Sequence, residues 1–277
     1  MGKRLTDGQV QQFAAQGFLA PLRVMSEADA FAFRRRLEGW EERAGHKLES
    51  NLRHKVNLLF PWCDEMVRHP AILDYVEDLI GPDILCWNVH LFAKDADGRS
   101  FVSWHQDSTY WGLEPADVVT AWVALSEASL TSGCMQVIPG SHLTDQLPHV
   151  DTFARDNLLS RGQEIAVEVD ESQAATLALR PGEMSLHHIK LVHGSRPNRS
   201  NDRRIGVAIR YMPPHVQQMR YRDSAMLVRG EDRYHHFDTD PRPRADMDEA
   251  ALAAHADAMQ RVISGLMQGT GQAAFRP

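Results

Sequence analysis

Between residues 83 and 212, short segments of alternating apolar and polar residues follow one another, and this pattern restricts the fold more than any other feature. Turn signals such as Asp97-Gly98, Ser132-Gly133 and Pro181-Gly182 separate the segments. Because no helical pattern intervenes, the chain is predicted to be mainly β, as an antiparallel sandwich or barrel. The predicted strands are "DILCWNVHLFAK", "VVTAWVALSE", "CMQVIPG", "EIAVEV", "ATLALR", "EMSLHH" and "RRIGVAIRYM".

Helical patterns flank this β region on both sides. In "LTDGQVQQFAAQGF", Thr6 is the predicted N-cap, Gln9 completes a capping box and Gly17 ends the helix. Further helices are predicted in "SEADAFAFRRRLEGWEER", capped by Ser26, in "HPAILDYVEDLIGP", and in "DEAALAAHADAMQRVISGLMQG" near the C-terminus. The charged, proline-rich "DTDPRPRADMD" before the last helix is predicted to be an exposed linker.

Length and composition favour a soluble, globular, intracellular protein. The 277 residues carry a net charge of −7, which argues against a nucleic-acid partner. No apolar run approaches the roughly 18–20 residues of a membrane span, and the start "MGKRLTDGQV" has no apolar signal core. The three cysteines are odd in number and widely spaced, which suits a reducing cytoplasm.

A His-x-Asp pair is a candidate metal site, because residues i and i+2 of a strand point to the same face. An imidazole and a carboxylate together suit a transition metal. The pattern is common, however, and most such pairs are a buried histidine beside a turn aspartate. Of the four pairs, one lies on the last predicted helix, two lie in turn-rich segments, and only the first ends a β region with aromatic flanks. The pairs are His105/Asp107, His149/Asp151, His236/Asp238 and His255/Asp257.

The stretch "LHHIKLVHGSRPNRSNDRRIGVAIRY", residues 186–211, offers a third ligand among its histidines. His193 follows Asp107 by 86 residues, opens the sequence "HGSRPNRS", and precedes Arg204 by 11 residues. This order resembles the phytanoyl-CoA dioxygenase family of iron(II)- and 2-oxoglutarate-dependent oxygenases. "LTDGQVQQFAAQGFL", "FVSWHQDSTYWGL" and "SGCMQVIPGSH" are similar to other signatures of that family, so the resemblance covers most of the chain.

The resemblance implies a double-stranded β-helix, which is a jelly-roll, cupin-like barrel open at one end. It implies one domain over residues 1–277, with a helical region at 1–82, a jelly-roll core at about 83–215 and a C-terminal extension with a helix at 216–277. His105, Asp107 and His193 match the ligands of catalytic iron(II), a two-histidine, one-carboxylate set that leaves positions open for 2-oxoglutarate and O₂.

The co-substrate site is also implied by the resemblance. Arg204 matches the arginine that grips the distal carboxylate of 2-oxoglutarate, and Ser195 matches a hydroxyl that assists it. The strand with Asn88 corresponds to one that lines the co-substrate pocket, which makes Asn88 a candidate donor. His187 and His188 either support the metal site or only pack beside it, and packing is the favoured interpretation.

Strand alternation gives a partly separate argument for the arginine. In "RRIGVAIRY", Arg204, Gly206, Ala208 and Arg210 share one face, and the small residues on it leave room for a ligand. The isoleucines and valine between them should pack against helices or a sheet. The alternative is that Arg204 forms only a surface ion pair.

The implied activity is hydroxylation of an unactivated C–H bond of a small polar metabolite, such as an amino-acid derivative, a phosphonate or a natural-product intermediate, with release of succinate and CO₂. Relatives that halogenate have glycine or alanine at the carboxylate position, so Asp107 favours hydroxylation, desaturation or ring formation. His90, Arg210 and Tyr110 are candidate substrate contacts, although His90 suits a core position equally well and Arg210 an internal ion pair. The alternative is a non-oxidative metal-dependent lyase or isomerase, or a ligand-binding protein, and succinate formation would separate the two.

Two irregular segments are predicted to border the substrate cavity, because loops at the open end of a barrel carry specificity. The first is residues 45–65, which mix Lys47, Arg53 and Lys55 with Phe60 and Trp62 in a composition suited to a lid. The second is the loop from Ser108 to Asp117.

Overall fold

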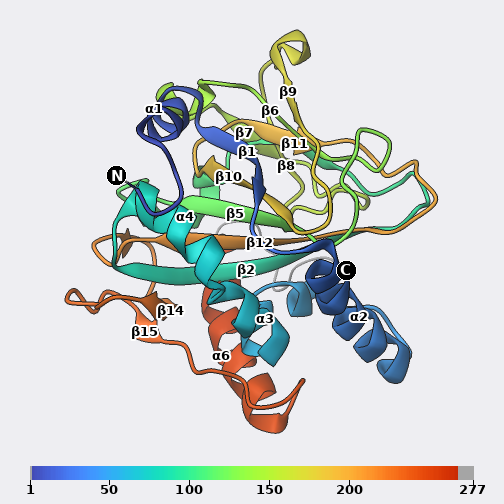
Figure 1. Cartoon of the computed structure of the whole chain (residues 1–277), viewed down its shortest axis with the longest axis vertical. Coiled ribbons are helices and arrows are strands. Elements are labelled where there is room, and N and C mark those ends of the chain that lie inside the picture. Colours follow the sequence, from blue (N-terminus) through green and yellow to red (C-terminus); the bar gives the residue numbers. More distant parts are fainter. Residues whose placement is uncertain (1, 268–277) are drawn as a thin grey trace.

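The computed structural model describes residues 2–267 of the chain (Figure 1). The helices are α1 (Asp7–Gln16), α2 (Glu27–Ala44), η1 (Ser50–Arg53), η2 (Val56–Leu58), α3 (Pro61–Val67), α4 (Pro70–Ile80), α5 (Ser108–Trp111), η3 (Ser141–Leu143), η4 (Glu171–Gln173) and α6 (Glu249–Leu266). The strands are β1 (Phe18–Arg23), β2 (Ile84–Lys94), β3 (Val102–His105), β4 (Leu113–Glu114), β5 (Val119–Ala124), β6 (Met135–Val137), β7 (His149–Asp151), β8 (Gln163–Ile165), β9 (Ala175–Leu177), β10 (Glu183–His188), β11 (His193–Ser195), β12 (Arg204–Met212), β13 (Gln217–Gln218), β14 (Ser224–Arg229) and β15 (Asp238–Thr239).

Two sheets face each other and confirm the predicted fold class. The larger has the order β1-β10-β5-β12-β2-β14-β15, and the smaller has the order β3-β11-β6-β9. Side chains from both sheets line one cavity between them. Within residues 2–267 the two sheets share no paired edge, so the jelly roll is an open one with helices on its outside (Figure 1).

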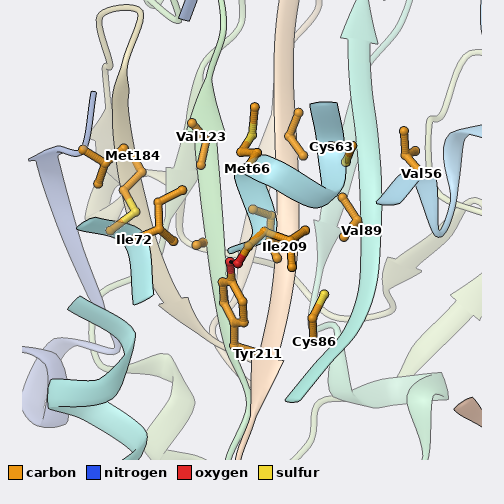
Figure 2. Close-up of a cluster of buried hydrophobic side chains, with 14 of the residues drawn as sticks. Val56, Cys63, Met66, Ile72, Cys86, Val89, Val123, Met184, Ile209 and Tyr211 are labelled. Atoms are coloured by element: carbon orange, nitrogen blue, oxygen red, sulfur yellow. Dashed lines mark hydrogen bonds between the residues drawn. The ribbon is translucent and has the colours of Figure 1, made fainter. Parts of the chain in front are cut away.

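The hydrophobic core lies between the outer face of the large sheet and the helices α2, α3 and α4. Ile205, Val207 and Ile209 of β12 point into this core, as the alternation in the sequence predicts. Figure 2 shows Ile209 and its neighbours on the sheet facing side chains such as Met66 and Ile72 from the helices. The Tyr211 hydroxyl donates a hydrogen bond of 2.8 Å to the backbone carbonyl of Val67, which ties β12 to the end of α3.

The predicted helices and their ends are confirmed where the structure describes them. Thr6 and Gln9 form the capping box of α1, and Gly17 ends that helix with φ +80°. Ser26 caps α2 by accepting from the backbone N–H of Asp29. The last helix ends at Leu266, and residues 268–269 of its predicted span lie outside the described residues.

The chain ends contribute more to the large sheet than the sequence patterns indicate. Strand β1, within the region expected to be helical, pairs with β10. Strand β14 pairs with β2, and β15 adds to it in parallel. The segment expected to be an exposed linker therefore begins as a strand, and its Asp240 is buried. Among the residues described, no helix combines the length and the apolar character needed to cross a bilayer.

The composition of residues 45–65 suggested a lid, and this interpretation is wrong, because most of the segment is built into the core. Phe60 and Trp62 are fully buried and pack on Trp40 and Phe33. Lys55 is also fully buried, and its ammonium group donates to Asp240 at 2.8 Å and to the carbonyl of Ser224. A buried charge requires such partners, so the basic residue fixes the C-terminal extension to the sheet.

Candidate metal centre

His105, Asp107 and His193 come together at one buried point between the two sheets. Their ligand atoms lie within 4.8 Å of one another, and all three side chains are buried. His105 and His193 are directly opposite each other on the paired strands β3 and β11, and Nε2 of His105 lies 3.4 Å from Oδ1 of Asp107. This is the only such group of three among residues 2–267.

The strand argument for the His105/Asp107 pair is wrong in its geometry. Strand β3 ends at His105, and Asp107 has the helical dihedrals φ −60° and ψ −35° just before α5. The chain thus turns between the two residues, and this turn, not the alternation of a strand, directs the carboxylate toward the imidazole. The residue types and the aromatic flanks indicated this pair, but the extended backbone predicted between the two residues is wrong.

Hydrogen bonds fix the orientation of both imidazole rings. Nδ1 of His105 lies 2.9 Å from the carbonyl of Ser103 and 3.0 Å from that of His193. Nδ1 of His193 lies 2.9 Å from the carbonyl of Leu191. Because a carbonyl only accepts, each Nδ1 carries the proton and each Nε2 keeps a lone pair for a metal.

The electrostatics of the cluster also suit a cation. Burial lowers the pKa of His193 well below its usual value, which keeps the ring neutral. Burial alone would raise the pKa of Asp107, but its close contact with the His105 ring and the nearby His193 and Arg210 lower it overall. A neutral imidazole and an ionised carboxylate are the forms that bind a divalent ion.

The other three His-x-Asp pairs form ordinary structural contacts. His149 lies on strand β7 and not in a turn-rich segment, and its Nε2 accepts from the backbone N–H of Gln106. The carboxylates of these pairs bind arginines instead. They are Asp151 with Arg161, Asp238 with Arg222 and Arg261, and Asp257 with Arg261.

A first chamber of about 410 Å³ opens from the cluster between the sheets. Arg204 and Ser195 lie on its wall, and so do Ala208 and Arg210 from the predicted cavity face of β12. Arg204 is 2% exposed, and its Nε and Nη2 have no hydrogen-bond partner within residues 2–267. Burial lowers its pKa to about 10. A buried guanidinium with unused donors is a site for an anion, and the surface ion pair considered as an alternative is excluded.

Lys94, which the sequence reasoning missed, lies beneath this wall. It pairs in register with Arg204 and is fully buried, and its amino group donates to Oγ of Ser195 at 2.6 Å. Burial and the neighbouring Arg204 lower the pKa of Lys94 to about 6. With Lys94 as its donor, the Ser195 hydroxyl can direct its own proton into the chamber.

Thr120 and His187 also line the first chamber. Thr120 was not among the predicted site residues, and His187 was predicted either to support the metal site or only to pack beside it. They are opposite each other on β5 and β10, and the hydroxyl of Thr120 and Nδ1 of His187 lack partners. Burial lowers the pKa of His187 to about 4. The alternation in "VVTAWVALSE" places Thr120 and Trp122 on one face of the strand, and this signal could have indicated Thr120 as a site residue.

The space over Gly206 is not free for a ligand, as its small size had suggested, because the ring of Trp122 fills it. A Cβ at this position would lie 2.0 Å from Cζ2 of Trp122. The same ring faces the Arg204 guanidinium, whose carbon is 5.1 Å from the ring centre. Gly206 therefore allows Trp122 to lie flat under the arginine.

The Gly206→Ala variant should be destabilised by about 1–3 kcal/mol, because the added methyl forces the Trp122 ring to move. Equilibrium urea unfolding measures the change. Gly39→Ala is the matched control, since a Cβ there meets nothing closer than 3.6 Å and the residue lies inside α2. The control should gain up to about 1 kcal/mol from its better helix propensity. Equal stability of Gly206→Ala and the wild type would contradict the packing described.

A second chamber of about 420 Å³ adjoins the first and shares Phe92, Asp107 and Arg210 with it. His54 and Trp111 come from the two segments predicted to border the substrate cavity, so both segments reach it with one residue each. Its wall is completed by parts of the chain that the sequence did not indicate. These are Trp87, Leu159, Ser160, Gln163 and Leu266.

The three candidates Asn88, His90 and Tyr110 differ in whether they reach a chamber wall. Asn88 and His90 line the second chamber, and Asn88 is opposite Arg210 in register, six residues along β12 from Arg204. Asn88 is thus separated from Arg204 by about 20 Å of strand and is not beside it. Tyr110 is on neither chamber wall among the described residues, and its ring packs under the Arg161 guanidinium.

Alternation along β2 would place Cys86, Asn88 and His90 on one face, but this pattern breaks at Trp87. A register shift opposite Arg210 and Tyr211 leaves Trp87 unpaired, so the strand contains a β-bulge. Cys86 consequently points into the helix-side core, whereas Asn88 and His90 point to the second chamber. The simple alternation of the sequence could not show this change of face.

Comparison with known proteins assigns the family. The model of the phytanoyl-CoA dioxygenase family matches residues 13–206. A probable alpha-ketoglutarate-dependent hypophosphite dioxygenase from Stutzerimonas stutzeri is 32% identical over 158 residues, which is 56% of this chain and 54% of that protein. The human peroxisomal phytanoyl-CoA dioxygenase is 30% identical over 55% of this chain and 45% of its own length. The chain thus spans about half the length of these curated relatives.

The solved structure of ThoJ, a non-heme monooxygenase in its apo form, is 35% identical and has a TM-score of 0.83. The alignment covers 94% of this chain and 97% of ThoJ. CytC3 with Fe(II) and alpha-ketoglutarate has a TM-score of 0.67 at 21% identity and shares the fold. The chain is a member of the phytanoyl-CoA dioxygenase family, whose members depend on iron and 2-oxoglutarate, and its His105, Asp107 and His193 cluster is a possible site for the metal.

Proposed function

We propose that the protein hydroxylates an unactivated C–H bond of a small polar metabolite in a reaction that consumes 2-oxoglutarate and O₂ and releases succinate and CO₂. The observation that carries this proposal is the pairing of two features in one chamber. The His105, Asp107 and His193 cluster occupies one end, and the buried, unpartnered guanidinium of Arg204 lies on the wall beyond it.

His105, Asp107 and His193 would hold iron(II) through two Nε2 atoms and one carboxylate oxygen. Bound there, iron(II) with 2-oxoglutarate and O₂ supplies the oxidising power that converts C–H to C–OH while the co-substrate is decarboxylated. Arg204 would hold the distal carboxylate of 2-oxoglutarate with its two free donors, and Ser195 would donate a second hydrogen bond. Trp122 keeps water from the face of the guanidinium.

Two features favour this proposal over its alternatives. A non-oxidative lyase or isomerase, or a ligand-binding protein, would have no use for a buried carboxylate clamp beside the metal cluster. Asp107 occupies the ligand position that halogenation would need open, which favours hydroxylation. The description of the 35% identical structure as a monooxygenase supports the same choice.

The test is a screen of polar metabolites with the purified protein, iron(II), 2-oxoglutarate and O₂. The expected result is succinate formation that rises with one substrate class, together with a product heavier by one oxygen atom. With ¹⁸O₂, the label should appear in the product. Conversion of a substrate without O₂ or 2-oxoglutarate would contradict the proposal and favour the non-oxidative alternative.

A further inference from the structure

Arg210 is a second buried arginine for which neither the metal cluster nor the co-substrate clamp has a use. It lies six residues after Arg204 on the same strand face, is 6% exposed, and lines both chambers. Its Nη1 donates to the carbonyl of Ala208, but its Nε has no hydrogen-bond partner in the part of the chain that the structure describes. Aromatic rings surround the guanidinium, with the centre of Trp111 at 5.1 Å and that of Phe92 at 5.8 Å.

The charges around Arg210 do not balance once the family's cofactors are present. Among the described residues, Asp107 is the only acidic one on the wall of the second chamber, and it belongs to the metal cluster. Iron(II) with Asp107 and two neutral imidazoles has one net positive charge. The 2-oxoglutarate dianion with Arg204 has one net negative charge. These two charges offset each other, so the charge of Arg210 is left without a counter-charge among the residues that line the chambers.

His90 offers a second polar group to the same chamber. It is 4% exposed, and its Nε2 has no hydrogen-bond partner. Its ring lies between those of His54 and Phe92, with centres 4.0 Å away on each side. A neutral imidazole can place its proton on Nε2 and donate it to an anion. The stack fixes the ring, so this donor is held in place before a ligand arrives.

A network behind the wall fixes these groups. Lys55 donates its backbone N–H to the amide oxygen of Asn88, and its ammonium group binds Asp240 and Ser224. Trp87 donates to Asp223 at 2.6 Å. The chamber wall is thereby anchored to the C-terminal extension, and buried ion pairs of this kind hold positions rigidly.

We infer that the second chamber is the substrate site and that it selects a short organic molecule with an oxyanion head, a carboxylate or a phosphonate, bound by Arg210 and His90. The inference rests on the proposed function and specifies its substrate class. The aromatic faces of Trp87 and Trp111 would pack against the apolar body of such a molecule.

Binding can be tested without turnover. The full-length protein is loaded with iron(II) and saturating 2-oxoglutarate in the absence of O₂, and butyrate, methylphosphonate and butyramide are titrated separately. Tryptophan fluorescence reports occupancy, because Trp111 and Trp87 line the chamber. Butyrate or methylphosphonate should bind more than about tenfold tighter than the neutral, equally sized butyramide. The stronger of the two anions identifies the head group.

The variant Arg210→Met should lose this preference for anions, whereas Arg203→Met should keep it. Arg203 is the matched control because it lies on the same strand region but pairs with Glu41 outside the chambers. If Arg210→Met does not fold, His90→Phe serves instead, since a phenyl ring preserves the stack and removes only Nε2. It should weaken anion binding several-fold.

If neither butyrate nor methylphosphonate binds the wild type more tightly than butyramide does, the inference is overturned. An unchanged preference in Arg210→Met would also overturn it, as would a butyrate response that disappears when 2-oxoglutarate is raised, because butyrate would then occupy the Arg204 site. These outcomes differ from failure of the proposed function. In that case no substrate would stimulate succinate formation, although the anion preference measured by fluorescence would remain.

Discussion

Asp107→Ala protein should lose substrate-dependent succinate formation by more than about 100-fold, because the change removes one of three ligands and not a group that merely supports a ligand. Its iron(II) content after gel filtration should fall in parallel. The fold should survive, since the side chain fills little core volume. We expect a melting temperature within about 4 °C of the wild type.

Asp257→Ala is the matched control for this experiment. Asp257 belongs to another His-x-Asp pair, is 64% exposed, and forms an i,i+4 ion pair with Arg261 on α6. Its replacement should leave iron content and turnover near normal. Asp151 and Asp238 should behave similarly, although Asp151 holds Arg161 near the second chamber and is the less clean control. Wild-type turnover in Asp107→Ala would disprove the assigned metal ligands.

Arg204→Met should weaken 2-oxoglutarate binding by about 30-fold or more, because losing a buried, charge-assisted contact costs about 2–5 kcal/mol. Methionine keeps most of the side-chain volume, so the chamber should not collapse. Iron(II) affinity should remain within a few-fold of the wild type, since Arg204 is not among the ligands. Calorimetric titration of 2-oxoglutarate into iron(II)-loaded protein without O₂ measures the first affinity, and titration of iron(II) into the metal-free protein measures the second.

Arg203→Met and Arg210→Met separate the role of Arg204 from a general effect of positive charge. Arg203 is the preceding residue, points away from the chambers and binds Glu41, so its loss should not change 2-oxoglutarate affinity. Arg210 shares the chamber face with Arg204. If Arg210→Met, and not Arg204→Met, lost co-substrate affinity, the clamp would be assigned to the wrong arginine.

Local patterns in the sequence were sufficient wherever the structure depends on near neighbours. The capping box at Thr6 and Gln9, the helix end at Gly17 and the two faces of β12 were all predicted correctly, because each depends on residues within a few positions. The order of motifs identified the family for the same reason, since motif spacing along a chain is a property of its sequence.

Tertiary structure decided what depends on contacts between distant segments. The bulge at Trp87 turns Cys86 into the helix-side core while Asn88 stays on the chamber side, and nothing in the alternation of β2 marks it, because a bulge is defined against the partner strand. Lys55 looked like part of a lid until its partner Asp240, 185 residues away, placed it in the core. The sequence alone determined which residues could bind a metal and a carboxylate. Strand β12 has two arginines that face the cavity, and only its pairing with β2 and β5 determined which of them was left without a counter-charge. The physical reason is that burial and charge balance arise from packing between segments far apart in the chain.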